Sequence, residues 1–295
     1  MFVKTKENFM GAIDTAFKKE FATTLYLLSQ QSGSKLMGTV RHETDFTGEA
    51  KFYNQYGEDE AKEKNTRHQD IEHNADDYSR RMVTPKLAYW AKLIDTEDEI
   101  SMGLDPKSAL MTAGKNCIGR KIDDYILSAL RGTAMTGAEG TTETALGSGQ
   151  KVAADGTGLT LDKILDAQEI MNDADVPEDE RYWVYGPKQL KDLLKITEVT
   201  SIDFNAQKAL VAGRMSAFLG FTWIMSTRLT LSSTTRYNMA YHRQGILLAS
   251  QGGVNTAIDK IVTKVKQPWQ LYADIYCGST RMEEEMVVEV SCIES

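Results

Sequence analysis

The chain has 295 residues, of which 41% are hydrophobic, so it is long enough and apolar enough to bury one large core or two modest ones. Its formal net charge is −8, which disfavours broad nucleic-acid binding, because such a surface repels phosphates. No apolar run approaches the length of a membrane span, and the N-terminus lacks a signal-peptide core. We therefore expect a soluble intracellular protein.

The N-terminal segment, residues 8–31, carries an apolar stripe at helical spacing. Phe9, Ile13, Phe17 and Phe21 recur four residues apart, which places them on one face of a helix. We expect this helix to be an arm that docks on the body of its own chain or on a neighbour.

A very polar stretch, residues 34–94, follows the arm. Strand-like pieces flank a tip of almost wholly polar residues, which predicts a strand out, a solvated tip and a strand back. From Arg41 to Arg81 there are seven Lys or Arg and eleven Asp or Glu, a net charge of −4. A segment this poor in apolar side chains cannot bury a core of its own. It is either a solvated surface loop or a hairpin that leans on a partner.

A long helix comes next. Asp105 and Pro106 are typical of a helix start, and Gly132 is typical of a stop. Some 26 residues at 1.5 Å each give a rod of roughly 39 Å. The side chains expected on its apolar face include Leu110, Ile118, Ile122, Tyr125 and Ile126.

The rest of the chain mixes helices and strands without a regular βαβ repeat, so we predict the α+β class. Six glycines make residues 133–158 a turn-rich connection. The elements expected after it are a helix ending before Pro177, a strand leading into a helix at Pro187, a strand over 221–225, an apolar segment over 237–250, and strands over 260–267, 270–282 and 284–293.

Enzyme motifs are weak or missing in the sequence. His68 and His73, near Asp70 and Glu72, lie in the polar tip at a spacing that separates their rings on a helix, so we expect no metal site. The sequence GSGQK lacks the spacing of a phosphate-binding loop. The remaining singletons, which show no context for catalysis, are His42, His242, Cys117, Cys277 and Cys292. We expect no catalytic residue, no cofactor and no metal, and we expect buried thiols of a reducing compartment.

Five ordered stretches resemble one family. They are RRMVTPKLAYWAKLIDTEDE, DPKSALMTAGKNCIGRKIDDYILSALRG, LTLDKILDAQEIMNDADVPEDERYWVYGPKQLKDLL, GRMSAFLGFTWIMST and YHRQGILLA. In this order and at this spacing they resemble the major capsid proteins of tailed bacteriophages with the Hong Kong ninety-seven phage fold. The resemblance covers the whole chain and rests on the order of the pieces, because no single piece is specific.

The resemblance implies a division of the chain. Residues 1–33 would be an N-terminal arm and 34–95 an extended loop. Residues 96–150 and 256–295 would form a peripheral domain built on the long spine helix. Residues 151–255 would form an axial domain.

The resemblance also implies a function: hexamers and pentamers of an icosahedral shell that encloses the double-stranded DNA of a tailed phage. The shell would form in the cytoplasm of the bacterial host, with a portal, a scaffold and decoration proteins as further partners, non-specific DNA contacts and no membrane. Some members cross-link subunits through a loop lysine, and Lys51, Lys62 and Lys64 are available. An encapsulin-like compartment shell and an unrecognised cytoplasmic enzyme are the alternatives. The side chains expected at the subunit interface are Arg41, Lys51, Arg80, Arg81, Met82 and Val83.

Overall fold

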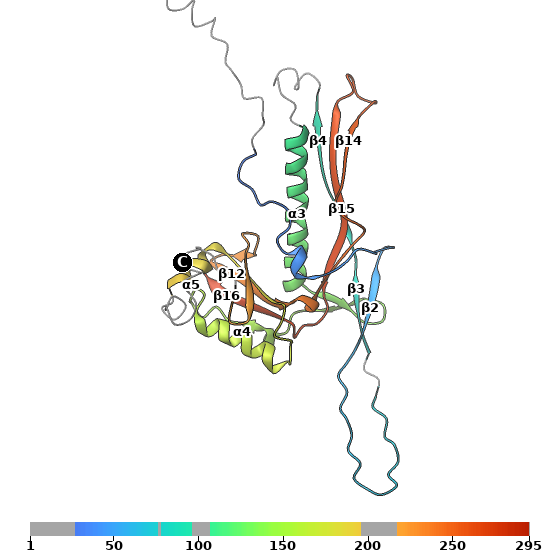
Figure 1. The fold of residues 1–295 in the computed structure, drawn as a ribbon, viewed down its shortest axis with the longest axis vertical. Helices are drawn as coiled ribbons and strands as arrows, with labels where there is room; N and C mark the ends of the chain where they lie inside the picture. The colour runs from blue at the N-terminus through green and yellow to red at the C-terminus, as the bar shows by residue number, and fades with distance from the viewer. Residues whose placement is uncertain (1–26, 76–77, 96–106, 196–216, 295) are drawn as a thin grey trace, which may run out of the picture.

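A computed structural model describes residues 27–75, 78–95, 107–195 and 217–294. Figure 1 shows an elongated subunit with a rounded lobe, in which α4, α5, β12 and β16 lie. A long arm leaves the lobe, with helix α3 beside strands β4, β14 and β15. A thin hairpin continues from β2 and β3 toward the opposite end of the long axis.

Helix α3 (Lys107–Arg131) is the predicted long helix. Ile118, Ile122 and Ile126 are at most 2% exposed, and their spacing of four places them on the face that packs against the sheet. Leu110 and Tyr125, expected on the same face, are partly buried against the core. The helix ends at Arg131, next to Gly132, as expected, and the Gly132 N–H makes the last helical hydrogen bond, to the carbonyl of Ser128 at 2.8 Å. The predicted cap, Asp105 and Pro106, lies outside the described residues.

A five-stranded sheet supports α3. Its long central strand β15 (Trp269–Arg281) pairs antiparallel with β4 (Lys86–Ile94), β14 (Asn255–Lys260) and β13 (Ile246–Ser250). Strand β1 (Arg41–Glu43) adds to β13 in parallel. Side chains from α3, β13 and β15 form one buried cluster, so the helix and the sheet fold as one body.

The lobe is built on a seven-stranded sheet with α4 (Leu161–Asp173) and α5 (Pro187–Lys195). Its centre is aromatic: the ring of Trp183 stacks on that of Trp223 with 4.9 Å between centroids. Thr160 caps α4 by accepting from the Lys163 N–H at 3.4 Å. The strands, in spatial order, are β7 (Lys151–Val152), β16 (Val287–Ile293), β12 (Thr235–His242), β8 (Arg181–Tyr185), β10 (Phe221–Met225) and β9 (Ala217–Phe218), with β11 (Leu231–Ser232) beside β12.

The third sheet joins the projecting hairpin to the body. Strands β2 (Lys51–Tyr56) and β3 (Tyr78–Val83) pair over six residues, and β3 continues to β5 (Ala134–Thr136) and β6 (Thr142–Thr144). The described ranges also contain three short 3₁₀ helices: η1 (Met37–Thr39), η2 (Ser148–Gln150) and η4 (Arg243–Gly245). The mixture of helices and sheets agrees with the α+β class predicted from the sequence.

The predicted strand over 260–267 is wrong: it is a turn, because β14 ends at Lys260 and the chain then reverses into β15. The glycine-rich stretch after α3 is turn-rich, as expected, and it also holds short strands. It contains the β5–β6 hairpin, whose turn uses Gly137 and Gly140 at φ +90° and +66°, a conformation that favours glycine. The predicted N-terminal helix lies mostly outside the described residues.

Three cysteines are free thiols. Cys277 and Cys292 are buried, and burial raises the pKa of each to about 11. Cys117, on α3, is partly exposed, contrary to the expectation that all three are buried. Because a thiol with a raised pKa is a poor nucleophile, the two buried cysteines act as packing residues.

Candidate subunit interface at the projecting hairpin

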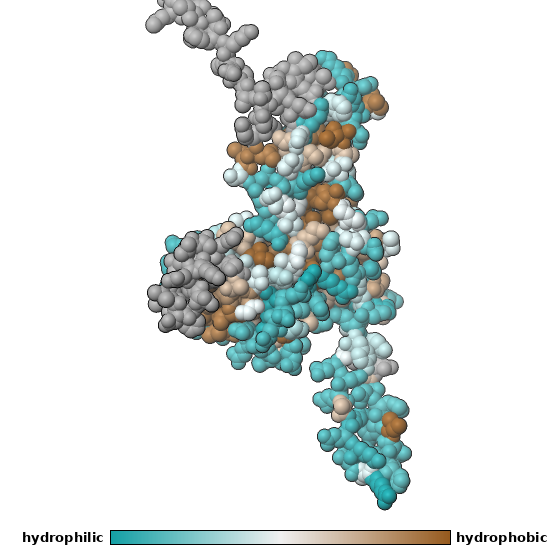
Figure 2. Space-filling model, in the orientation of Figure 1, coloured by the Kyte–Doolittle hydropathy of each residue, from teal (hydrophilic) through white to brown (hydrophobic). Residues whose placement is uncertain are grey.

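The hairpin leaves the body through the β2–β3 pair, whose inner face packs on the body at Tyr53 and Val83. From Gly57 to Ala75, nearly every residue is exposed. Figure 2 shows a predominantly hydrophilic projection below the body. A two-stranded ribbon is at best marginally stable in water without a third layer. Its stability therefore depends on the contacts at its base and on a partner for its exposed face.

Aromatic side chains line one face of the ribbon and keep much of their surface exposed. Phe52, Tyr56 and Tyr78 are 42%, 53% and 69% exposed. The rings of Tyr56 and Tyr78 meet edge to face at 5.1 Å, across the last pair of the ladder. Exposed aromatic side chains on a narrow element are typical of a surface that binds a partner.

A buried ion pair fixes the base of the hairpin. The Arg81 guanidinium donates to both carboxylate oxygens of Glu284, at 2.9 and 2.5 Å, and its Nε donates to Gln55 at 3.2 Å. Gln55 in turn donates to the carbonyl of Met282 at 3.1 Å. Such a two-pronged pair fixes orientation as well as position, so the ribbon leaves the body in a defined direction.

The same carboxylate contacts a second arginine. Arg281, fully buried at the end of β15, lies 3.4 Å from Glu284. Its other nitrogens donate to the carbonyls of Leu130 at 3.1 Å, Gly132 at 2.8 Å and Thr144 at 3.0 Å. Burial lowers the pKa of Arg281, but an arginine stays protonated, and its charge meets the negative end of the α3 dipole.

These contacts correct part of the predicted interface. Arg81 is 9% exposed and is paired within its own chain, and Val83 is 1% exposed in a core cluster with Phe46. Their side chains have little surface left for a neighbour. The reason is the alternation of a strand, which turns these two toward the body and leaves Arg80 on the other face. Met82, partly exposed, packs close to the β5–β6 turn at Gly140.

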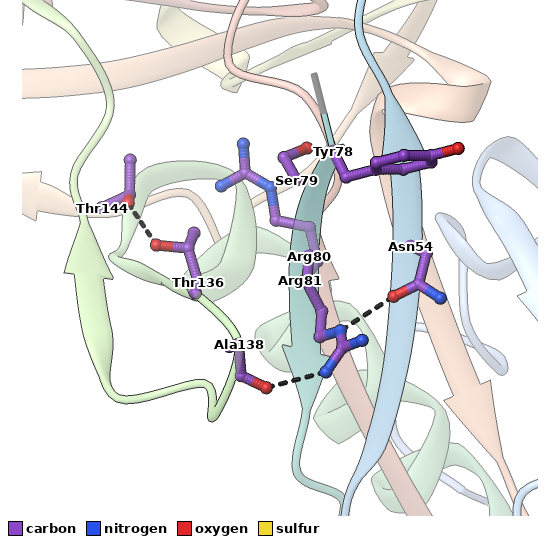
Figure 3. A pocket seen from close by; sticks show the side chains of 9 residues that line it. Asn54, Tyr78, Ser79, Arg80, Arg81, Thr136, Ala138 and Thr144 are labelled. Carbon is purple, nitrogen blue, oxygen red and sulfur yellow. Dashed lines mark hydrogen bonds between the residues drawn. The ribbon is translucent and has the colours of Figure 1, made fainter. Parts of the chain in front are cut away.

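Arg80 lies at an open groove of about 500 Å³ between β3 and the β5–β6 turn. Figure 3 shows its guanidinium reaching Asn54 and the carbonyl of Ala138, at 2.8 and 2.9 Å. The guanidinium carbon also lies 5.7 Å from the centroid of the Phe52 ring. Arg80 is thus held in one orientation beside the exposed aromatic face, where a neighbouring chain can reach it.

Arg41 and Lys51, the other predicted interface residues, meet at one carboxylate. Glu43 pairs with Arg41 at 2.6 Å and with Lys51 at 3.1 Å, and it accepts from the Tyr53 hydroxyl at 2.8 Å. Burial alone would raise the pKa of Glu43, but the hydrogen bonds from Tyr53, Lys51 and Arg41 lower it. The cluster ties β1 to the start of β2. Arg41 keeps half of its side-chain surface exposed.

Asp123, which the sequence-based expectations did not single out, anchors the segment before η1. Its carboxylate, fully buried on α3, accepts from the Ser34 hydroxyl at 2.5 Å and from the Leu36 N–H at 3.1 Å. One helical turn earlier, Gly119 allows a close approach, because a Cβ there would lie 2.4 Å from the carbonyl carbon of Gly33. Helical periodicity places Asp123 at the border of the apolar stripe. An acidic residue at that border was the one sequence signal that could have indicated a buried, hydrogen-bonded carboxylate.

The described residues contain no group of three His, Cys, Asp or Glu side chains that could hold a metal ion. His68 and His73 lie in the exposed tip. His42 contacts the Ser250 hydroxyl at 2.8 Å, and His242 accepts from the Gln244 N–H at 3.2 Å. Neither pair forms the chain of nucleophile, base and orienting group that covalent catalysis needs. None of the helices in the described ranges has the length and apolarity needed to cross a bilayer.

Comparisons with known proteins agree with this geometry. The phage capsid protein family matches residues 13–294. No curated protein sequence matches. The structure is similar to the capsid of the cyanophage P-SCSP1u, with a TM-score of 0.74 and 15% identity over 96% of this chain and 95% of that one. The capsid of cyanophage Pam1 gives a TM-score of 0.73 and 13% identity over 95% of this chain and 97% of that one. The capsid of the Helicobacter pylori bacteriophage KHP30 gives a TM-score of 0.71 and 8% identity over 99% of each chain. At these identities the likeness shows the fold alone, and the capsid fold expected from the sequence is confirmed.

Proposed function

This chain belongs to the phage capsid protein family and has the role of a major capsid protein, and we propose that its copies form the hexamers and pentamers of an icosahedral shell around double-stranded DNA. The observation that carries the proposal is the projecting hairpin. It is anchored by buried contacts at its base, yet Phe52, Tyr56 and Tyr78 are left exposed along it. A hairpin whose base is fixed by buried contacts and whose aromatic side chains stay exposed is suited to bind a second molecule.

That partner is the next copy in the ring. A hairpin that reaches out from one side of each subunit makes a head-to-tail contact, and such contacts close into rings. We place Arg80 and the aromatic face of the hairpin against the neighbour, with Arg41 and Lys51 near the entrance of the ribbon. We assign the role of the extended loop to the β2–β3 hairpin and its tip. The other boundaries suggested by the sequence shift, because β4 and β13 belong to the sheet that supports α3 and β16 belongs to the sheet of the lobe.

The remaining partners follow from the same proposal. The shell is part of the virion, assembles in the cytoplasm of the bacterial host, and works with a portal, a scaffold and decoration proteins. Its contact with DNA is non-specific and weak, because a subunit with a net charge of −8 lets the duplex slide past instead of binding it. The family match favours a phage shell over an encapsulin-like compartment.

The direct test is microscopy of the purified protein, with light scattering across salt and protein concentrations. We expect capsomers or shells. A stable monomer under all conditions would refute the proposal. Portal and terminase genes beside this one are expected for a phage shell, and a packaged-enzyme gene instead would point to the compartment.

The matched variant is Arg80→Glu, which reverses a charge at the proposed contact without touching the buried base. We expect a native circular dichroism spectrum and a loss of shells of about tenfold or more. Normal shell yield from this variant would place the subunit contact elsewhere.

A further inference from the structure

A short segment of the chain lies where α3 meets the lobe. It comprises residues 31–39, ends in η1, and is called the brace below; Figure 1 shows it beside α3. Its first apolar residue is Leu36, which is fully buried, and the residues before it are polar or glycine. Polar contacts therefore hold the first part of the brace in place.

A single carboxylate on α3 makes most of these contacts. Asp123 accepts from the side chains of Gln31 and Ser34, each at 2.5 Å. It also accepts from the N–H groups of Lys35 and Leu36, each at 3.1 Å. Because a buried charge is costly unless hydrogen bonds compensate it, the folded subunit needs these donors beside Asp123. Removing this one acceptor should therefore loosen the brace as a unit.

The surface of α3 is shaped to admit the backbone of the brace. A Cβ atom at Gly119 would lie 2.4 Å from the carbonyl carbon of Gly33, closer than any side chain allows. One turn earlier, Asn116 accepts from the Gly33 N–H at 3.1 Å. Gly33 itself has φ +66°, a conformation that favours glycine. Helix and brace thus fit each other in one position.

The same segment contacts the lobe. The Lys35 ammonium donates to the carbonyl of Met225, at the end of β10, at 2.8 Å. The hydroxyl of Thr39 shares a buried hydrogen bond of 2.6 Å with that of Tyr241 on β12. Leu36 packs in the buried cluster that joins side chains of α3 and β12. The brace is therefore connected to both sides of the junction between α3 and the lobe.

We propose that the brace sets the angle between α3 and the lobe, and that a shell forms only when this angle is fixed. Any change in the angle has to break the contacts at Asp123 or those of Lys35 and Thr39. A ring closes only when each copy repeats the geometry of the last, so a subunit with a variable angle joins it poorly. This second part of the inference rests on the proposed function.

Two variants release the brace from α3 by different means. Asp123→Asn replaces an acceptor oxygen by an amide donor, and Gly119→Ala puts a methyl group where the Gly33 backbone lies. The second variant is informative because a Gly-to-Ala change inside a helix otherwise stabilises it. Hydrogen exchange of unassembled subunits should show the Lys35 and Leu36 amides exchanging about tenfold faster or more in both variants.

A distance between spin labels reports the angle. The labels are placed on Lys92→Cys in β4 and Lys191→Cys in α5, both exposed and away from the brace, in a Cys117→Ser background. We expect a narrow distance distribution with the brace intact, and one about twice as wide in both variants. The unlabelled variants should give about tenfold fewer shells.

The matched control is Asp124→Asn, at the next residue of α3. It removes a direct ion pair with Arg228 of the lobe, 2.5 Å long, but leaves the brace docked. Both side chains of this pair are partly exposed, so it contributes little, and we expect slow exchange, a narrow distribution and normal shells. A distribution as wide as that of Asp123→Asn would show that the ion pair sets the angle, and would overturn the brace.

The remaining outcomes are equally decisive. Fast exchange with unchanged distances, or slow exchange in both variants, would overturn the brace. Wide distances with a normal shell yield would overturn its role in assembly. Ser34→Ala, which removes a single donor, replaces Asp123→Asn if that variant does not fold. Failure of the wild type to form shells would refute the proposed function, whereas exchange and distances in unassembled subunits would still decide whether the brace sets the angle.

Discussion

Replacing Arg81 by alanine should destabilise the subunit although the residue lies on an element that projects into solvent. The side chains of Arg81 and Glu284 are 10% and 23% exposed and share two hydrogen bonds. Removing one partner of a buried pair costs about 3 to 5 kcal/mol of unfolding free energy. The lower end applies, because Glu284 keeps Arg281 at 3.4 Å and some contact with water. We expect a loss of about 3 kcal/mol, or a fall in melting temperature of about 5 to 8 °C.

The assay is denaturation of unassembled subunits, at concentrations where light scattering detects no capsomers. Arg80→Ala is the matched control, one residue away on the opposite face, and its loss should stay within about 0.5 kcal/mol because its partners are exposed. The two variants should therefore separate: Arg81→Ala loses stability, and Arg80→Ala loses assembly. Equal melting of both would show that the Arg81–Glu284 pair does not hold the base of the hairpin.

Three further predictions concern the body. Ile122→Asp places an unpaired carboxylate in the core at a residue 1% exposed and should cost about 4 kcal/mol or more, whereas Lys115→Asp on the exposed face of α3 should melt normally; thermal melting compares them. Lys163→Ala removes a buried ammonium that lies within 3.2 Å of four carbonyl oxygens and can donate to three of them at a time. Propylammonium, but not tetramethylammonium, should raise the melting temperature of the variant, and no difference between the two would contradict a hydrogen-bonding role. The hydrogen bond from Arg236 lowers the pKa of Glu294, so the stabilisation is present above the usual pKa of 4.5 and is lost as the pH falls through the folded-state value. Denaturation of Glu294→Gln should accordingly show lower stability at pH 7 and a shallower loss on acidification, and wild-type slopes would refute this.

The elements with a strong period were predictable from the sequence. The α3 stripe at Ile118, Ile122 and Ile126 and the strand-to-helix turn at Pro187 are local patterns, which depend only on neighbours in the chain. The turn at residues 260–267 was not predictable. Its apolar residues Val262 and Val265 suggested a strand, but both are exposed, and in the described residues the β14–β15 pairing stops at Lys260. An apolar pattern alone does not show whether another element will bury these side chains.

The contacts at the base of the hairpin were hidden for a different reason. Arg81 and Glu284 are 203 positions apart in the chain, and no local pattern connects residues at such a separation. The sequence shows two arginines beside two apolar residues, and both arginines were expected to face a neighbour. Only the pleat of β3, fixed by its pairing with β2 and β5, decides which of them turns inward.

This division between a buried and an exposed arginine has a consequence for assembly. Every copy in a shell must present its hairpin at nearly the same angle, since a ring closes only when each contact repeats the last. Glu284 meets Arg81 of the hairpin and Arg281, which in turn binds the carbonyl end of α3, so the direction of the ribbon is fixed to the long axis of the subunit. In the described part of the chain, the hydrogen bonds of the tip stay within the hairpin, such as those from Lys62 to His73 and from Asn74 to Glu60, so the tip can adapt to its partner. In the proposed shell, a rigid base would set the geometry of the ring, and an adaptable tip would allow the same subunit to fit both a hexamer and a pentamer.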